Sequence, residues 1–129
     1  MLTLPSVPRS VSRAVEAVEQ AVVRCGLSDE VVGRASLAVG EAVANAIEHG
    51  NEGEAHRRFG LAISPRENAL DVTVCDGGDG VEARDLAVAQ LPDDPLQTDG
   101  RGLYMIRMLS DETEVDGSCL RLTFRERTA

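Results

Sequence analysis

Three short polar segments, in a fixed order along the chain, restrict its possible folds more than any other feature. Residues 40–51 read GEAVANAIEHGN, residues 76–80 read DGGDG, and residues 100–103 read GRGL. The first segment has the pattern of a helix, whereas the other two are glycine-rich turns in which bare backbone can approach a ligand closely. The fold is therefore expected to bring one polar helix face and two glycine turns to the same ligand.

The helical segment spaces an acid, an amide and an imidazole four residues apart. Glu41, Asn45 and His49 would share one face of the helix, so their polar groups can converge. A lone glutamate is usually solvated, but Glu41 lies among apolar residues, where a carboxylate could polarise a hydroxyl beside a phosphate. The amide oxygen of Asn45 is a suitable Mg²⁺ ligand. His49 is open to two interpretations, because a cationic imidazole also caps the carboxyl end of a helix well.

The first glycine turn begins at Asp76, directly after an alternating strand. A loop aspartate commonly makes an Asx-turn, but its carboxylate could instead accept a hydrogen bond from the amino group of adenine. Gly78 and Gly80 would let the loop pass close to the base and the ribose. Taken alone, a turn of Asp and Gly is a weak motif.

The second glycine turn precedes an apolar helix. Gly100 and Gly102 flank Arg101 there, and backbone amides at a helix N-terminus bind phosphate well. Arg101 could contact the β- or γ-phosphate of a nucleotide, or it could be an exposed residue at a simple helix entry. An acidic base, a metal-binding amide and two phosphate-binding loops together predict an ATP site.

Length and charge set the class of protein. The 129 residues are expected to form a single domain, 1–129. A net charge of −9 argues against direct binding to nucleic acid or to an anionic membrane. An acidic protein that binds a nucleotide triphosphate is expected to do so with Mg²⁺, which offsets the phosphate charge.

The cysteines and the apolar segments indicate the compartment. Cys25, Cys75 and Cys119 are an odd number without close spacing, which argues against a disulfide framework or a zinc site and favours three buried thiols in a reducing cytosol. The N-terminus has no long apolar run, so no signal peptide is expected. No segment approaches the roughly 20 apolar residues that a membrane span needs. A cytoplasmic location is therefore expected.

The order of predicted elements favours an α/β two-layer sandwich, with a mixed, mostly antiparallel sheet and helices on one face. Residues 76–101 are predicted to form a lid with at most one short helix, 82–90. The other predicted elements are a strand in 1–7, helices 11–26 and 28–49, strands 59–63 and 70–75 around a turn at 64–68, helix 102–109, and strands 112–116 and 120–125.

The three segments together resemble the motifs of the GHKL (Bergerat-fold) ATP-binding superfamily. GEAVANAIEHGN resembles its N box, DGGDG its first glycine box and GRGL its second. Within the superfamily, the small single domain, the stretch EAVANAIEHG and the stretch GRGLYMIRMLSDE are most similar to bacterial anti-sigma factor serine/threonine kinases. The resemblance spans essentially the whole chain, and it implies the histidine kinase-like ATPase fold.

The resemblance implies roles for individual residues. Glu41 would be the general base, Asn45 the Mg²⁺ ligand, and Asp76 the residue that reads adenine. Many relatives have Gly-Thr in the penultimate turn, where this chain has Ser118 after a glycine. Further nucleotide contacts are implied for residues of the three motifs and of that turn: His49, Gly78, Gly80, Gly100, Arg101, Gly102, Leu103 and Ser118, with Arg101 also stabilising transferred charge in catalysis.

The implied function is an ATP- and Mg²⁺-dependent kinase. It would phosphorylate an anti-sigma antagonist protein of the STAS type and sequester a sigma factor, as a homodimer. One alternative is a nucleotide-gated binding module with little or no kinase activity, since gating uses nearly the same residues. A detached catalytic domain of a histidine kinase is disfavoured, because helix 11–26 contains no histidine to accept a phosphoryl group.

Overall fold

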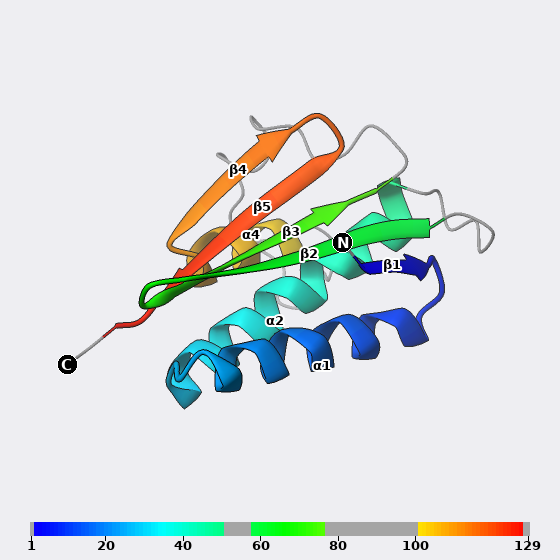
Figure 1. The fold of residues 1–129 in the computed structure, drawn as a ribbon. Coiled ribbons are helices and arrows are strands. Elements are labelled where there is room, and N and C mark those ends of the chain that lie inside the picture. The colour runs from blue at the N-terminus through cyan, green and yellow to red at the C-terminus, as the bar shows by residue number, and fades with distance from the viewer. Residues whose placement is uncertain (1, 51–57, 77–100, 128–129) are drawn as a thin grey trace.

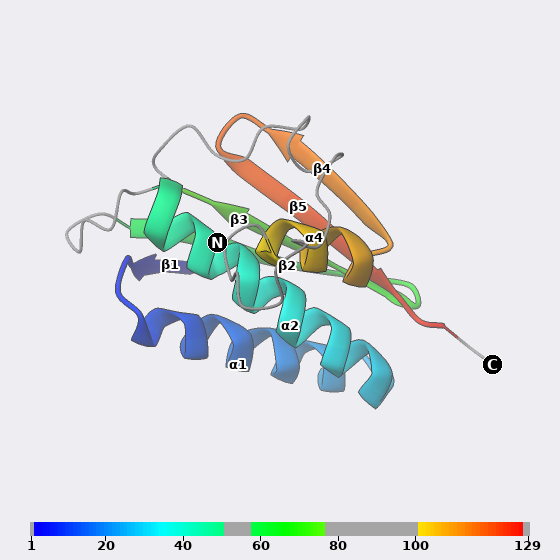
Figure 2. The ribbon, with the colours of Figure 1, turned by 180° about the vertical axis from the view of Figure 1, so that it is seen from behind.

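The computed structural model describes residues 2–50, 58–76 and 101–127, which form two layers (Figures 1 and 2). A five-stranded sheet makes one layer, and the helices cover one of its faces. The elements are β1 (Leu2–Pro5), α1 (Arg9–Arg24), α2 (Asp29–Asn45), the π-helical turn η1 (Ala46–Gly50), β2 (Arg58–Arg66), β3 (Ala69–Cys75), α4 (Arg101–Leu109), β4 (Glu112–Asp116) and β5 (Cys119–Arg125).

The sheet has the strand order β1-β2-β3-β5-β4, and every pair of described neighbours is antiparallel. β3 lies at the centre, where Val72 is in register with Ile63 of β2 and Leu122 of β5. The two-layer sandwich with helices on one face is thereby confirmed. The predicted lid lies outside the described residues, apart from its two ends at Asp76 and Arg101.

The core lies between the sheet and the helices. Successive side chains of a strand point to opposite faces, and in β3 Leu70, Val72 and Val74 share the face that belongs to the core. The largest fully buried side chains come from both layers, and burying each one stabilises the fold by roughly 1.5–3 kcal/mol. They are Val18, Val22, Val31, Val39, Val43, Phe59, Leu61, Leu70, Val72, Ile106, Leu122 and Phe124.

The helix boundaries follow the predicted signals with two differences. Gly26, with φ of 73°, ends the first helix, as expected for a residue that tolerates positive φ. Ser28 occupies the N-cap position of α2, but its side chain makes no cap hydrogen bond; its backbone N–H instead donates to the Glu126 carboxylate at 3.1 Å. The predicted continuous helix to His49 is wrong beyond Asn45, a poor helix former, where the π-helical turn η1 follows.

The hairpin between β2 and β3 is tighter than predicted. β2 continues to Arg66, and the turn consists of Glu67 and Asn68 instead of five residues. Asn68 adopts a φ of 56°, which asparagine tolerates better than most residues. Pro65 does not end the strand early, although proline cannot donate a hydrogen bond to a partner strand.

A buried arginine anchors the first half of α2. Arg34 is 6% exposed, and its guanidinium donates to the Glu30 carboxylate at 2.6 Å and to the Asp111 carboxylate at 2.9 Å. It also donates to the carbonyl oxygens of Leu109 at 3.2 Å and Arg125 at 2.5 Å. A buried charge is tolerated when it is paired and hydrogen-bonded in this way. Arg34 therefore ties α2 to the end of α4 and to the edge of the sheet.

Arg34 contributes to lowering the pKa of each of the two carboxylates that it contacts. Burial acts to raise the pKa of Asp111, but the backbone N–H of Arg125 and the Arg34 guanidinium hold it below its usual value of 3.8. The hydrogen bond from Arg34 likewise lowers the pKa of Glu30. Both acids are therefore ionised at neutral pH and hold the arginine in place.

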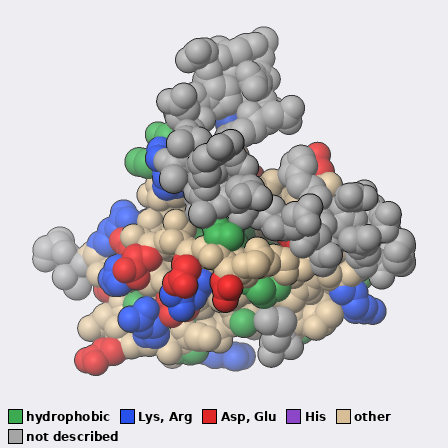
Figure 3. All heavy atoms as spheres, turned by 90° about the horizontal axis from the view of Figure 1, so that it is seen from above, with side chains coloured by type: hydrophobic (Ala, Val, Ile, Leu, Met, Phe, Trp, Pro, Cys, Tyr) green, Lys and Arg blue, Asp and Glu red, His purple; other side chains and the backbone are tan. Residues whose placement is uncertain are grey.

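The face of the sheet away from the helices is polar. β4 and β5 place Glu114 opposite Arg121, and the two side chains form an ion pair. Arg125 pairs with Glu112 at 2.7 Å on the same face. Figure 3 shows acidic and basic side chains side by side on the described part of this surface. Such exposed pairs contribute little to stability, at most about 1 kcal/mol each.

Candidate functional site

The carboxylate of Glu41 lies against the backbone of Gly102, so the first and third sequence motifs meet in space. α2 and α4 pack against each other (Figure 2). A Cβ atom placed on Gly102 would lie 2.9 Å from Glu41 Oε2, closer than real Cβ contacts come. The absence of a side chain at Gly102 is thus what leaves room for the glutamate. Both residues are partly exposed, so the carboxylate can reach a ligand.

The first residues of α4 supply the other groups of the third motif. Arg101 is the first residue of this helix and is partly buried. Leu103 packs against the hydrophobic core and fixes the start of the helix to the domain. The N-terminus of α4, where the first backbone N–H groups have no acceptor within the helix and carry partial positive charge, therefore begins next to the Glu41 carboxylate. Gly100 lies outside the described residues.

The other two residues of the predicted helix face are placed differently. Asn45 is the last residue of α2, one turn beyond Glu41, and is partly exposed. Those two side chains keep the predicted i, i+4 relation. His49 lies in η1, where the hydrogen bonds run from residue i to i+5. The predicted α-helix therefore ends before His49, whose side chain lies outside the described part of the chain, and its role stays a prediction.

Asp76 and Ser118 form a second close pair of predicted site residues. Asp76 follows the last residue of β3, and its backbone N–H donates to the carbonyl oxygen of Ser118 at 3.1 Å. Ser118 lies in the turn between β4 and β5, next to Gly117, which has a φ of 60°. β3 and β5 are neighbours in the sheet, which explains how residues 42 positions apart in sequence come together. Gly78 and Gly80 lie outside the described residues.

A disulfide bond joins the two strands at the same point, which corrects the prediction of three free thiols. Cys75 and Cys119 lie directly opposite each other in β3 and β5, with Cα atoms 4.0 Å apart, and are bonded. Cys25 is free and partly buried. The pairing was not visible in the sequence because it depends on β3 lying next to β5. The two cysteines lie 44 positions apart along the chain, with α4 and β4 between them.

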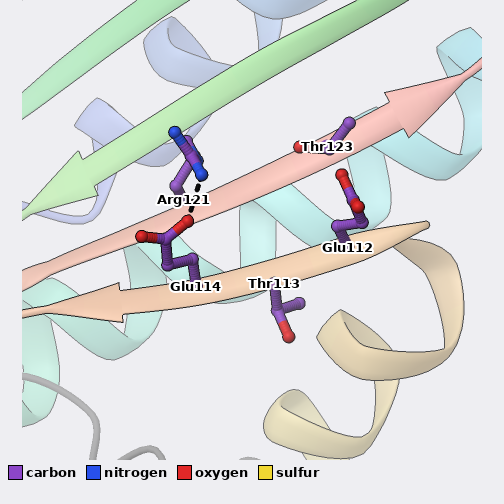
Figure 4. A pocket seen from close by; sticks show the side chains of 5 residues that line it. All are labelled: Glu112, Thr113, Glu114, Arg121 and Thr123. Atoms are coloured by element: carbon purple, nitrogen blue, oxygen red, sulfur yellow. Dashed lines mark hydrogen bonds and ion pairs between the residues drawn. The ribbon is translucent and has the colours of Figure 1, made fainter.

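One surface hollow of the described residues is formed by β4 and β5, and it is lined by Glu112, Thr113, Glu114, Arg121 and Thr123. Figure 4 shows the acidic and arginine side chains on the outer face of the sheet, with Thr113 pointing the opposite way. Because its charged side chains are already paired, and because it lies across the sheet from α2, this hollow is not the place where Glu41 and Gly102 meet.

The groups near α2 and β3 suit a magnesium nucleotide. A carboxylate and an amide oxygen one turn apart are hard ligands of the kind Mg²⁺ prefers. Backbone N–H groups at the N-terminus of a helix, such as those at the start of α4, suit a phosphate. No helix in the described ranges 2–50, 58–76 and 101–127 is long and apolar enough to cross a membrane.

Comparison with known proteins agrees with this arrangement. A family profile described as a histidine kinase-like ATPase domain matches residues 4–125. The chain is 26% identical over 120 residues to the serine-protein kinase RsbW of Listeria innocua, an alignment that spans 88% of this chain and 76% of the relative. It is 32% identical over 103 residues to RsbW of Bacillus licheniformis, spanning 71% and 62%. For RsbW of Bacillus velezensis the identity is 29% over 127 residues, spanning 91% and 77%.

The profile covers nearly the whole chain, and the three relatives are all named as serine-protein kinases. The matched region runs from β1 to the end of β5, so it includes every described element that carries a predicted site residue. The two-layer fold and the meeting of Glu41 with Gly102 are consistent with it. The chain belongs to the family of histidine kinase-like (GHKL) ATPase domains and, within it, to the anti-sigma serine kinase group that RsbW represents.

Proposed function

We propose that this protein is a serine/threonine kinase that transfers the γ-phosphate of ATP to an anti-sigma antagonist protein of the STAS type and sequesters a sigma factor. The observation that carries the proposal is the contact between Glu41 and Gly102, because it joins a candidate base to a candidate phosphate loop. RsbW relatives named as serine-protein kinases support the reaction type.

Each residue has a role that its position permits. Glu41 accepts the proton of the attacking serine hydroxyl, while backbone N–H groups at the start of α4 hold phosphate oxygens. Arg101 stabilises the charge of the transferred group. Asp76 accepts a hydrogen bond from the adenine amino group, and Ser118, which it contacts through the backbone, lies beside it.

The metal would be held mainly by Asn45. Its amide oxygen lies one helical turn from Glu41, so a cation there is close to the carboxylate as well. When bound, Mg²⁺ would supply positive charge that offsets the charge developing on the transferred phosphate. In an acidic protein this cation also offsets the repulsion between the domain and the nucleotide.

The proposed partners are inferred from the anti-sigma serine kinase group and not from a surface of the described residues. An antagonist that supplies the serine, a sigma factor that is held inactive, and a second copy of the chain are the proposed partners. A cytoplasmic location goes with them. Direct contact with nucleic acid or membrane is not part of the proposal, because the net charge of −9 disfavours both.

Replacing Glu41 with glutamine tests the proposal. Labelled ATP, Mg²⁺ and a purified candidate antagonist are incubated with the parent, with Glu41→Gln and with Glu16→Gln. Glu16 is an exposed acid on α1 and supplies a matched loss of charge. We expect Glu41→Gln to lower the transfer rate by about 100-fold or more, since the general base is lost, while ATP affinity changes little. Glu16→Gln should transfer phosphate at the parent rate.

Two outcomes would contradict the kinase. Transfer by Glu41→Gln at the parent rate would remove Glu41 from the chemistry. A parent that binds ATP but labels no antagonist would instead be a nucleotide-gated binding module. In that case the antagonist and the sigma factor should still compete for the protein in a nucleotide-dependent way.

A further inference from the structure

We propose that the Cys75–Cys119 disulfide is a reversible redox control of nucleotide binding, in which the oxidised protein binds ATP more tightly than the reduced protein. The inference rests on the proposed function, since it concerns the same ATP site. It starts from the place of the bond in the sheet, because the disulfide closes the very strand ends that carry two of the candidate nucleotide contacts.

The two cysteines are the immediate neighbours of those contacts. Cys75 precedes Asp76, and Cys119 follows Ser118. The hydrogen bond from the Asp76 N–H to the Ser118 carbonyl lies one residue beyond the disulfide. In an antiparallel ladder this makes Cys75 and Cys119 a non-hydrogen-bonded pair, the kind whose Cα atoms approach most closely. The disulfide thus cross-links β3 and β5 at a pair that backbone hydrogen bonds do not join, one residue before the ladder reaches Asp76 and Ser118.

The bond is open to small molecules. Both cysteines are partly exposed and point to the outer face of the sheet, away from the hydrophobic core. They line a surface hollow of about 280 Å³ together with Thr73, Glu114, Asp116 and Arg121. A thiol reagent can therefore reach the sulfur atoms without unfolding the domain. Buried structural disulfides lack such access.

Reduction is a thiol–disulfide exchange with a small-molecule thiol. A thiolate attacks one sulfur, forms a mixed disulfide with that cysteine and releases the other as a thiolate, which takes up a proton. A second thiol then displaces the first cysteine and leaves as the small-molecule disulfide. The protein gains two electrons and two protons, and two molecules of thiol are oxidised. A low-molecular-weight disulfide reverses both steps.

Reduction of the disulfide is expected to weaken nucleotide binding. In the oxidised protein, the ends of β3 and β5 are held together, so Asp76 and Ser118 keep one relative position. After reduction that position must be maintained by backbone hydrogen bonds alone, and nucleotide binding must then order the two ends. Preorganisation is lost, so affinity falls.

Measuring ATP affinity in two redox states of the 129-residue chain tests the inference. Calorimetry with Mg·ATP is performed on protein treated with oxidised glutathione and on protein treated with dithiothreitol, and a thiol titration counts free cysteines in each. We expect one free thiol in the oxidised protein and three in the reduced protein. The Kd for ATP should rise about fivefold or more on reduction, the lower end of coupling between linked sites.

Variants identify the cysteines responsible. Cys25→Ser removes the free thiol and should keep the full redox response. The double variant Cys75→Ser with Cys119→Ser should bind ATP like the reduced parent under both conditions. A readout without variants uses reciprocity: Mg·ATP should shift the exchange equilibrium with glutathione toward the disulfide by the same factor.

The outcomes separate the inference from the proposed function. Equal ATP affinity in both redox states would overturn the redox control and leave the nucleotide site standing. Three free thiols after oxidation would overturn it as well. An absence of ATP binding in either state would overturn the proposed function, and the redox control with it. A redox dependence of ATP affinity that persists in the double serine variant would also overturn the redox control by this disulfide, because another group would then cause the dependence.

Discussion

The two ends of α2 carry polar residues of opposite kinds. Near its start, Arg34 is buried and its guanidinium donates four hydrogen bonds to other elements or to its own helix. Near its end, Glu41 and Asn45 are partly exposed, and no hydrogen bond or ion pair joins either side chain to another residue of the described part of the chain. A satisfied buried group specifies structure, whereas an open polar group is available to a ligand. One helix is therefore anchored at one end and functional at the other.

The largest expected effect comes from removing the anchor. Arg34→Met should lower the free energy of unfolding by about 3 kcal/mol, since it leaves the Asp111 carboxylate and two backbone carbonyls without their partner. The midpoint of urea unfolding measures the loss. ATP affinity of the folded fraction should stay at the parent value, because the anchor is not part of the site.

An exposed arginine supplies the control for that experiment. Arg13→Met, on the outer side of α1, should change stability by less than about 0.5 kcal/mol. If Arg34→Met were as stable as Arg13→Met, the network would not anchor the helix. If it abolished ATP binding without unfolding, the two ends of α2 would not be independent.

Crowding the end of α2 that carries Glu41 should lower the rate of phosphate transfer and leave the stability of the protein unchanged. In Gly102→Ala the new methyl group must displace the Glu41 carboxylate, whose flexible side chain can yield without unfolding the protein. A misplaced catalytic group costs about 100-fold in rate, so phosphate transfer should fall by that order while stability is kept. Steady-state transfer assays and thermal unfolding measure the two effects.

Gly33, which lies on α2, is a matched control for Gly102. A Cβ atom there meets nothing within 4 Å, so Gly33→Ala should stabilise the protein by about 0.5–1 kcal/mol through helix propensity alone. Its transfer rate should equal that of the parent. Equal rates for Gly102→Ala and Gly33→Ala would show that the contact between α2 and α4 does not position Glu41.

A smaller effect concerns pH at the anchored end. The pKa of Asp111 is lowered on folding, so its ionised form stabilises the native state fully above its usual value of 3.8 and this contribution is lost as pH falls below that value. Asp111→Asn should cost about 1–2 kcal/mol at pH 7. The difference from the parent should shrink below pH 3.8. A constant difference over this range would contradict the pairing.

Much of this molecule could be predicted from local patterns. The alternation of apolar residues in β3 and the glycine that ends α1 are local signals, and both elements lie where expected. The motif spacing placed Glu41 on a helix and Gly102 at a helix start. That the two residues touch is a tertiary fact, because it depends on α4 packing beside α2.

The features that were missed all depend on distant parts of the chain. The partner of Cys75 could not be identified before β5 was known to lie beside β3. In the sequence, Arg34 cannot be distinguished from an ordinary helix arginine, because its hydrogen bonds to Asp111 and to the carbonyl of Arg125 form only in the folded protein. The π-helical turn at Ala46–Gly50 interrupts a pattern that continues through it in sequence. The periodicity of a sequence predicts single helices and strands, and it does not predict the contacts between them.

Calorimetric titration of ATP, with Mg²⁺ and with a chelator, tests the central claim that the carboxyl end of α2 forms a magnesium nucleotide site. The parent should bind ATP tightly in Mg²⁺ and much more weakly in the chelator. Asn45→Ala should lose about tenfold or more of the affinity in Mg²⁺, the loss expected when a metal ligand is perturbed, and none in the chelator. Parent-like binding of Mg·ATP by Asn45→Ala, or no binding by the parent, would contradict the claim.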